Sequence, residues 1–154
     1  MHPVERAATR DLVAVIDEAT TLFGVWAHMG SPIFATREIQ SADAALSGAR
    51  HFLKKLTLLE TMASDGPFLL GKKVTVADCI AMALFQFIEG FYGVAIPERF
   101  PKLRAWYTSF SKRSSAPTHG YPTELAELAK GLIPATGLPV ARWEDGLSET
   151  AKAA

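Results

Sequence analysis

A threonine and an aspartate that could take part in acid–base chemistry, Thr75 and Asp78, stand three residues apart, just before an apolar run from Ile80 to Phe91. A carboxyl group buried beside such a run can serve as a general acid or base. The same spacing is that of a capping box, in which the threonine hydroxyl accepts from the aspartate backbone and the aspartate side chain reaches back to the threonine N–H. We predict the structural role, an N-cap at Thr75 and Asp78, rather than a catalytic one.

The single cysteine, Cys79, would lie in the first turn of the helix that follows, where the pKa of a thiol can be lowered. Because an apolar run follows it, we predict a buried and unreactive thiol. No metal site is predicted, since no two histidines share the i, i+4 spacing and no cysteine or acidic residue stands at ligand spacing from one. No catalytic residue is predicted either, because the signatures of serine hydrolases and phosphate-binding loops are missing. The histidines are His2, His28, His51 and His119.

A cluster of large side chains follows the first apolar stripe and extends into the loop beyond it: Trp26, His28, Met29, Ile33 and Phe34. Residues of this kind line small-molecule pockets, so the cluster is our candidate for an apolar ligand site. In the alternative interpretation, Trp26 completes the apolar stripe of a helix and Phe34 fills a loop. Both interpretations remain open at the level of the sequence.

The composition indicates a soluble globular protein. The chain has 154 residues, of which 49% are hydrophobic and 21% are charged, and its 16 basic and 16 acidic side chains cancel. This balance does not suggest a nucleic-acid or anionic-membrane surface. The longest nearly uncharged stretch, residues 79–87, is too short to span a bilayer. A lone cysteine fits a reducing compartment, so we predict a cytoplasmic protein.

Apolar residues recur at intervals of three and four along most of the chain, and this period predicts helices rather than strands. Prolines and glycines mark where the helices begin and end. The predicted helices span residues 3 to about 30, 36 or 37 to about 63, 76–91, 101 to about 113, and a short stretch after 122. The helix at 76–91 is apolar all round, so other helices should surround it. We also expect Ile39 in the second stripe, and Leu125, Leu128 and Leu132 facing inward in the last helix.

The residues around the capping box resemble a known family. Residues 67–78, Pro-Phe-Leu-Leu-Gly-Lys-Lys-Val-Thr-Val-Ala-Asp, are similar to the start of the central helix in the C-terminal domain of glutathione S-transferases. Residues 96–107 resemble the start of that family's next helix. Residues 113–116 are similar to its Arg-Pro-Ser-Ala ending, with Ser114 where proline is usual. The resemblance covers roughly residues 3–118.

This resemblance implies an all-α fold, a bundle of the glutathione S-transferase C-terminal type with about five helices around a buried central helix at 76–91. The helical domain would occupy residues 1–133, followed by an irregular tail over 134–154. The family's threonine and aspartate at the positions of Thr75 and Asp78 form its folding N-cap. The family's first C-terminal helix lines a pocket for apolar electrophiles, which favours the cluster around Trp26 as a ligand site.

A complete glutathione S-transferase places a thioredoxin-like domain before the helical one, and that domain supplies the glutathione site and the catalytic Tyr, Ser or Cys. None of those residues has a counterpart here, so glutathione is expected as a ligand only if such a domain is supplied elsewhere. We expect a helical domain that provides the apolar electrophile pocket and scaffold of a glutathione-dependent transferase, with little conjugating activity of its own. The alternative is a non-catalytic assembly module. Its exposed helical face would be covered by a second copy of the chain, in a dimer or other homo-oligomer, or by a protein partner. A third possibility is an isomerase, lyase or hydrophobic-ligand binder that does not use glutathione.

Overall fold

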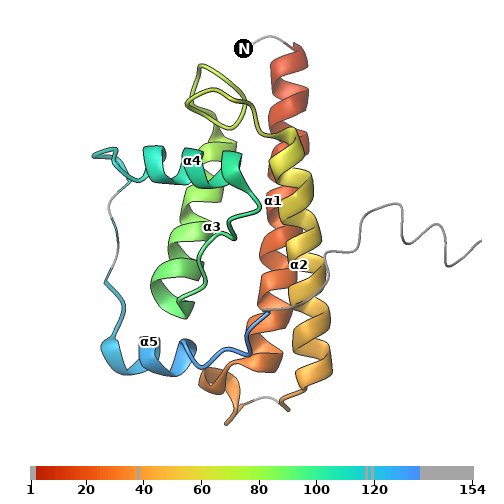
Figure 1. The fold of residues 1–154 in the computed structure, drawn as a ribbon, viewed down its shortest axis with the longest axis vertical. Coiled ribbons are helices and arrows are strands. Elements are labelled where there is room, and N and C mark those ends of the chain that lie inside the picture. The colour runs from red at the N-terminus through yellow and green to blue at the C-terminus, as the bar shows by residue number, and fades with distance from the viewer. Residues whose placement is uncertain (1–2, 38, 117, 119, 136–154) are drawn as a thin grey trace, which may run out of the picture.

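The computed structural model describes residues 3–37, 39–116, 118 and 120–135, and this part of the chain is a bundle of helices (Figure 1). Two long antiparallel helices, α1 and α2, run along its length, and α3 lies beside them. The shorter helices α4 and α5 cross the bundle toward its two ends. Within the described ranges there is no strand, so the predicted all-α fold is confirmed. The elements are α1 (Pro3–Gly30), the 3₁₀ turn η1 (Pro32–Phe34), α2 (Ala42–Met62), α3 (Val76–Tyr92), α4 (Pro101–Phe110) and α5 (Thr123–Ala129).

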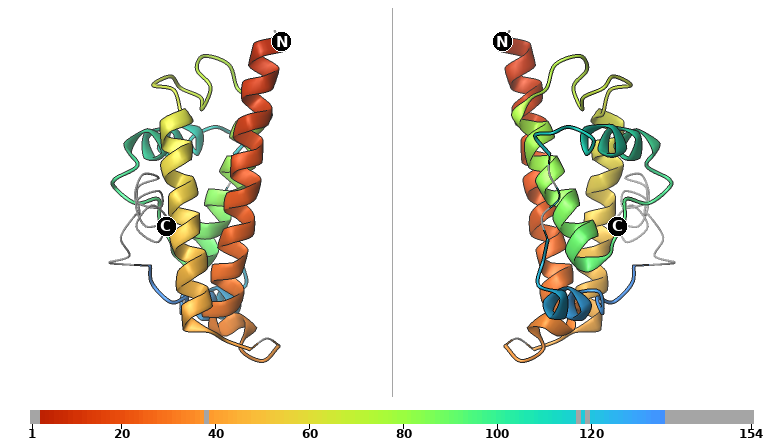
Figure 2. Two further views of the ribbon diagram at one scale, coloured as in Figure 1. Left: turned by 90° about the vertical axis from the view of Figure 1, so that its right-hand side faces the viewer. Right: turned by 90° about the vertical axis from the view of Figure 1, so that its left-hand side faces the viewer.

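The α1–α2 pair forms the longest helix contact of the bundle, and both side views show the two helices side by side (Figure 2). The buried stripe of α1 includes Leu12, Ile16 and Phe23, at the spacing expected of one helix face. Gly48 of α2 lets the backbones come close, because a Cβ atom there would lie 2.8 Å from the backbone nitrogen of Trp26. By length and composition α1 is also the one described helix that could cross a membrane, but its apolar stripe is used in the contacts with α2 and α3.

The second helix begins later than predicted, at Ala42 rather than at Thr36 or Arg37. The hydroxyl oxygen of Ser41 accepts from the backbone N–H of Ala44 at 3.3 Å and so caps the first turn. The expectation for Ile39 was wrong as well, since its side chain is 90% exposed. The polar cap at Ser41 therefore determined the helix start more strongly than the apolar period that runs on before it.

The central helix α3 spans Val76–Tyr92, within one residue of the predicted 76–91. Its C-terminus is closed by Gly93 at φ 71°, a left-handed conformation that glycine adopts without strain. Its buried residues are Ala77, Asp78, Ala81, Met82, Leu84, Phe85, Ile88, Phe91 and Tyr92. The side that carries Val76 and Phe87 is open to solvent, with exposed fractions of 56% and 38%. Cys79 lies on that open side, so the prediction of a buried thiol was wrong.

The two short helices are held by contacts distant in sequence. The carboxylate of Glu60 on α2 accepts from the backbone N–H groups of Lys102 and Leu103, at 2.8 and 3.0 Å, and so caps α4 from another helix. In α5 the expected orientation was wrong in part, because Leu125 and Leu128 are 44% and 49% exposed. The alanines at 126 and 129 face inward instead, and Leu132 is buried as expected. Small side chains on the inner face allow α5 to pack closely on α3 and η1.

Candidate functional site

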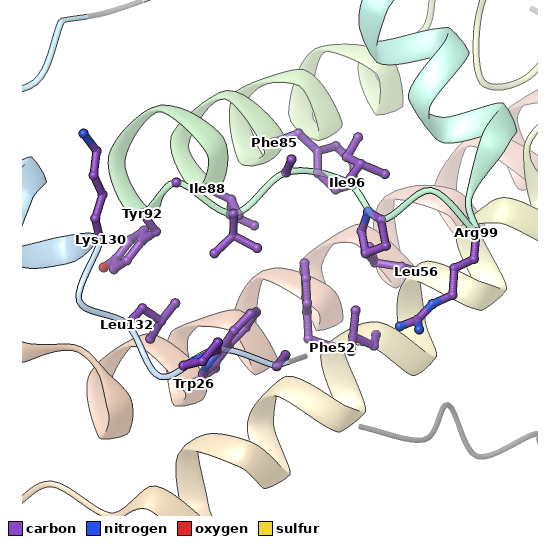
Figure 3. Close-up of a pocket in the computed structure, with 17 residues that line it drawn as sticks. Trp26, Phe52, Leu56, Phe85, Ile88, Tyr92, Ile96, Arg99, Lys130 and Leu132 are labelled. Atoms are coloured by element: carbon purple, nitrogen blue, oxygen red, sulfur yellow. The ribbon is translucent and has the colours of Figure 1, made fainter. Parts of the chain in front are cut away.

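A cavity of about 510 Å³ lies between α1, α2 and α3 and is closed by two irregular segments, residues 93–97 and 132–135 (Figure 3). Its volume falls within the range of small-molecule sites. Aromatic and aliphatic side chains from three helices and the segment after α5 form its walls. The principal ones are Trp26, Phe52, Leu56, Phe85, Ile88, Tyr92 and Leu132.

Trp26 is the residue of α1 that both lines this cavity and supports its wall. Its side chain is 2% exposed and makes an edge contact with the ring of Phe23, with centroids 5.6 Å apart. Its indole Nε1–H donates to the carbonyl oxygen of Ile133 at 2.8 Å. The backbone N–H of Ile133 in turn donates to the carbonyl oxygen of Gly30 at 3.1 Å. These two bonds hold the segment 132–135 across the end of α1, where it closes one side of the cavity.

Three polar groups border the cavity, from Tyr92, Arg99 and Lys130. Burial raises the pKa of Tyr92, so its phenol stays protonated in neutral solution. The Lys130 ammonium forms an ion pair with Glu127 at 2.7 Å and is directed away from Trp26 and Leu132 (Figure 3). Arg99 lies at the opposite end of the cavity. No acidic side chain is found among the described lining residues.

Of the five residues predicted to line a ligand pocket, Trp26 lines this cavity and the other four do not. His28 is exposed and stacks on the ring of Phe34, with centroids 4.0 Å apart. Met29 and Ile33 are partly buried and pack against the hydrophobic core. The chain leaves the helical path after α1 at Ser31, whose backbone is extended at φ −103° and ψ 134°, and η1 then packs against α5. This turn takes the loop residues away from the cavity.

Thr75 and Asp78 meet at a junction of three segments rather than in a cavity. The Oδ1 atom of Asp78 accepts from the backbone N–H of Leu69 at 2.8 Å and from the indole Nε1–H of Trp106 at 2.9 Å. Its Oδ2 atom accepts from the backbone N–H of Thr75 at 2.8 Å, which is the arm of a capping box that the aspartate contributes, and from the Thr75 hydroxyl at 3.0 Å. The Asp78 side chain is 0% exposed. All its contacts therefore tie the loop before α3 to α3 and α4.

Outside the cavity, the described chain holds further side chains of the kinds that activate thiols or bind metals. Burial, followed by a hydrogen bond with Glu89, raises the pKa of Tyr107, so this phenol is no phenolate at neutral pH. No group of three or more metal-ligating side chains occurs in the described ranges. His51 is exposed and its Nδ1 lies 2.8 Å from the carbonyl oxygen of Ser47, one turn earlier in α2. His2, His119 and the tail beyond residue 135 lie outside the described residues.

Sequence reasoning missed most of the cavity wall. The segment 93–97, with Arg99 just beyond it, contains no periodic pattern, and the segment 132–135 follows the last helix as an irregular stretch. Gly93 after the apolar run and Pro97 were the available signals, and they indicated only where a helix ends and a loop turns. Nothing in the sequence of either segment indicated that it would face Trp26 and Phe52.

Comparison with known proteins gives one match. The family model described as "Glutathione S-transferase, C-terminal domain" matches residues 8–109. These residues include most of α1, all of α2 and α3, and most of α4. They therefore include four of the five elements that surround the cavity, namely the three helices and the segment 93–97, but not the segment 132–135. A search of curated proteins and a search of solved structures each gave no match.

Proposed function

The chain belongs to the glutathione S-transferase C-terminal domain family, and we propose that it provides the apolar ligand pocket and scaffold of a glutathione-dependent transferase, with little conjugating activity of its own. The observation that carries this proposal is the cavity beside Trp26. Its walls are aromatic and aliphatic, as the binding of an apolar electrophile requires. The family and the helical fold indicate a soluble protein, and we propose the cytoplasm as its location, in keeping with the free thiol of Cys79.

The residues around the cavity do not fit glutathione by themselves. Glutathione carries an ammonium group and two carboxylates, and the described lining residues contain no acidic side chain to pair with the ammonium. The thiol of glutathione reacts as its thiolate, which requires a neighbouring group that stabilises the deprotonated form. Tyr92 is the one phenol among the described lining residues, and its raised pKa keeps it protonated, so it cannot act as the base that removes the thiol proton. These observations support a division of labour in which a thioredoxin-like domain supplied elsewhere binds and activates glutathione.

The chain alone is therefore expected to conjugate glutathione with 1-chloro-2,4-dinitrobenzene at the rate seen in buffer. The reason is that no described lining residue offers a carboxylate to the ammonium of glutathione, and the one lining phenol is protonated and cannot take up the thiol proton. The measurement is the rise in absorbance of the conjugate over time, with heat-denatured chain as the control for adventitious thiol chemistry at Cys79. A rate well above both controls, proportional to the concentration of folded chain, would contradict the proposal.

The alternative function, a non-catalytic assembly module, is favoured by a different observation. Large apolar side chains are exposed on α3 and α5, at Val76, Phe87, Leu125 and Leu128. Exposed apolar surface of this kind is often covered by a second copy of the chain or by a protein partner. Sedimentation velocity distinguishes a homo-oligomer from a chain that needs a different protein partner, because a stable monomer at micromolar concentration argues against the homo-oligomer. A recruited isomerase or lyase has less support, since no carboxyl group among the described lining residues could pair with Tyr92 for acid–base chemistry.

A further inference from the structure

We propose that the natural ligand of the cavity beside Trp26 is an apolar molecule with a single carboxylate, and that the guanidinium of Arg99 binds this carboxylate. The inference rests on the proposed role of the cavity as an apolar ligand site and specifies the chemical class of its ligand. A charged group on the ligand would lie near the charged side chains at the ends of the cavity. Among the described lining residues these are Arg99 and Lys130, and both are basic. An anionic ligand is therefore favoured over a cationic one.

Arg99 is the cation that is available for a ligand. The second cation at the border, Lys130, is already neutralised by Glu127 at 2.7 Å. Arg99 forms no ion pair within the described residues, and its recorded contact is with the ring of Phe100, whose centroid lies 5.1 Å from Cζ. The neighbouring acidic residue, Glu98, is directed to Arg104 at 3.5 Å instead. Arg99 is thus a cation at the mouth of an apolar cavity. Its acidic neighbour, Glu98, pairs with Arg104 instead.

The placement of Arg99 fixes how such a ligand would lie. Its side chain extends from the segment after α3 toward α2, at the end of the cavity near Leu56 (Figure 3). The aromatic side chains of Trp26, Phe52 and Tyr92 lie further along the cavity, so they would contact the apolar body of the ligand. A guanidinium binds a carboxylate through two parallel hydrogen bonds, which fixes the orientation of the ligand. A bicyclic aromatic acid combines these features, because its ring system matches the aromatic wall.

The test compares 2-naphthoate with its neutral methyl ester by isothermal titration calorimetry on the full chain. For Arg99→Gln we expect the affinity for the acid to fall about five- to tenfold, while the affinity for the ester stays the same. Arg50→Gln is the matched control, since Arg50 is also exposed and basic but neither lines the cavity nor pairs with Glu98, the acidic neighbour of Arg99. It should leave both affinities unchanged. Added salt should weaken the binding of the acid alone, because the Arg99 end of the cavity is reached by solvent.

The outcomes separate this inference from the proposed function. If the ester binds and Arg99→Gln leaves the affinity for the acid unchanged, the inference is overturned while the apolar site stands. If Arg50→Gln weakens the binding of the acid as much as Arg99→Gln does, the effect is one of net charge, and the inference is likewise overturned. If neither compound binds to the unaltered chain, the apolar site itself fails and the inference fails with it. Because Arg99 is exposed, both variants should keep the melting temperature of the parent chain, and Arg99→Lys should retain a preference for the acid.

Discussion

Replacement of Asp78 by alanine is expected to lower the free energy of unfolding by about 3 kcal/mol or more. The substitution removes the acceptor of four hydrogen bonds, from Leu69, from Trp106, and from the backbone and hydroxyl of Thr75. At least the donors of Leu69 and Trp106 are buried, so they would lose their partner without gaining water. The loss is best measured by urea denaturation followed by circular dichroism.

Two further variants make the result for Asp78 specific. Asp17→Ala removes an exposed carboxylate from α1 and should change stability by no more than about 0.5 kcal/mol. Asp78→Asn keeps an acceptor oxygen and the side-chain volume, so its loss should lie between those of the two alanine variants. An unchanged urea midpoint in Asp78→Ala, together with a loss of ligand binding, would show that this residue acts in function rather than in folding.

Replacement of Trp26 by alanine is expected to cost about 3–5 kcal/mol of stability, the usual loss for a fully buried tryptophan. The indole is 2% exposed and packs against the rings of Phe23 and Phe52. It also donates the hydrogen bond that holds Ile133 and the segment 132–135 over the end of α1. The substitution should therefore destabilise the core and open one wall of the cavity. Urea denaturation measures the first effect, and calorimetric titration with methyl 2-naphthoate measures the second.

The milder variant Trp26→Phe distinguishes these two contributions. It keeps an aromatic ring in the core but leaves the carbonyl of Ile133 without its indole donor, so a smaller loss of about 1–2 kcal/mol is expected. Leu58→Ala, on the exposed side of α2, is the matched control and should stay within about 1 kcal/mol of the parent chain. Near-native stability of Trp26→Ala would contradict the description of this side chain as a buried support of the cavity.

The sequence was sufficient to locate the elements whose signals are local. The capping-box spacing of Thr75 and Asp78 and the apolar run after them placed α3 within one residue at each end. Such prediction succeeds because a helix start is decided by side chains within one turn of it. The same reasoning misplaced the start of α2, where the polar cap at Ser41 and the turn after α1 outweighed the apolar period that includes Ile39.

The cavity could not be predicted because its walls come from segments far apart in the chain. Trp26 and Ile133 are joined by a hydrogen bond across 107 positions, and Glu60 caps α4 across 42 and 43 positions. Neither contact leaves a periodic pattern, since each is fixed only when the helices have packed. The orientation of α5 followed a similar rule, because small residues were required where the helix approaches its neighbours. Arg99 was likewise not recognised from sequence, as its importance depends on which side of a loop faces the core.

The central claim, that the cavity beside Trp26 is an apolar ligand site, is tested most directly by titration of the ¹⁵N-labelled chain with methyl 2-naphthoate, followed by NMR. The account predicts saturable shifts of the Trp26 indole N–H and of the backbone N–H groups of Ala95 and Ile96, which line the cavity from opposite sides. The variant Ala95→Phe, at an exposed lining position, should reduce the affinity by partly filling the mouth. The claim is contradicted if these resonances stay unchanged, or if the shifts gather instead around the second cavity, between residues 4–9 and 70–75.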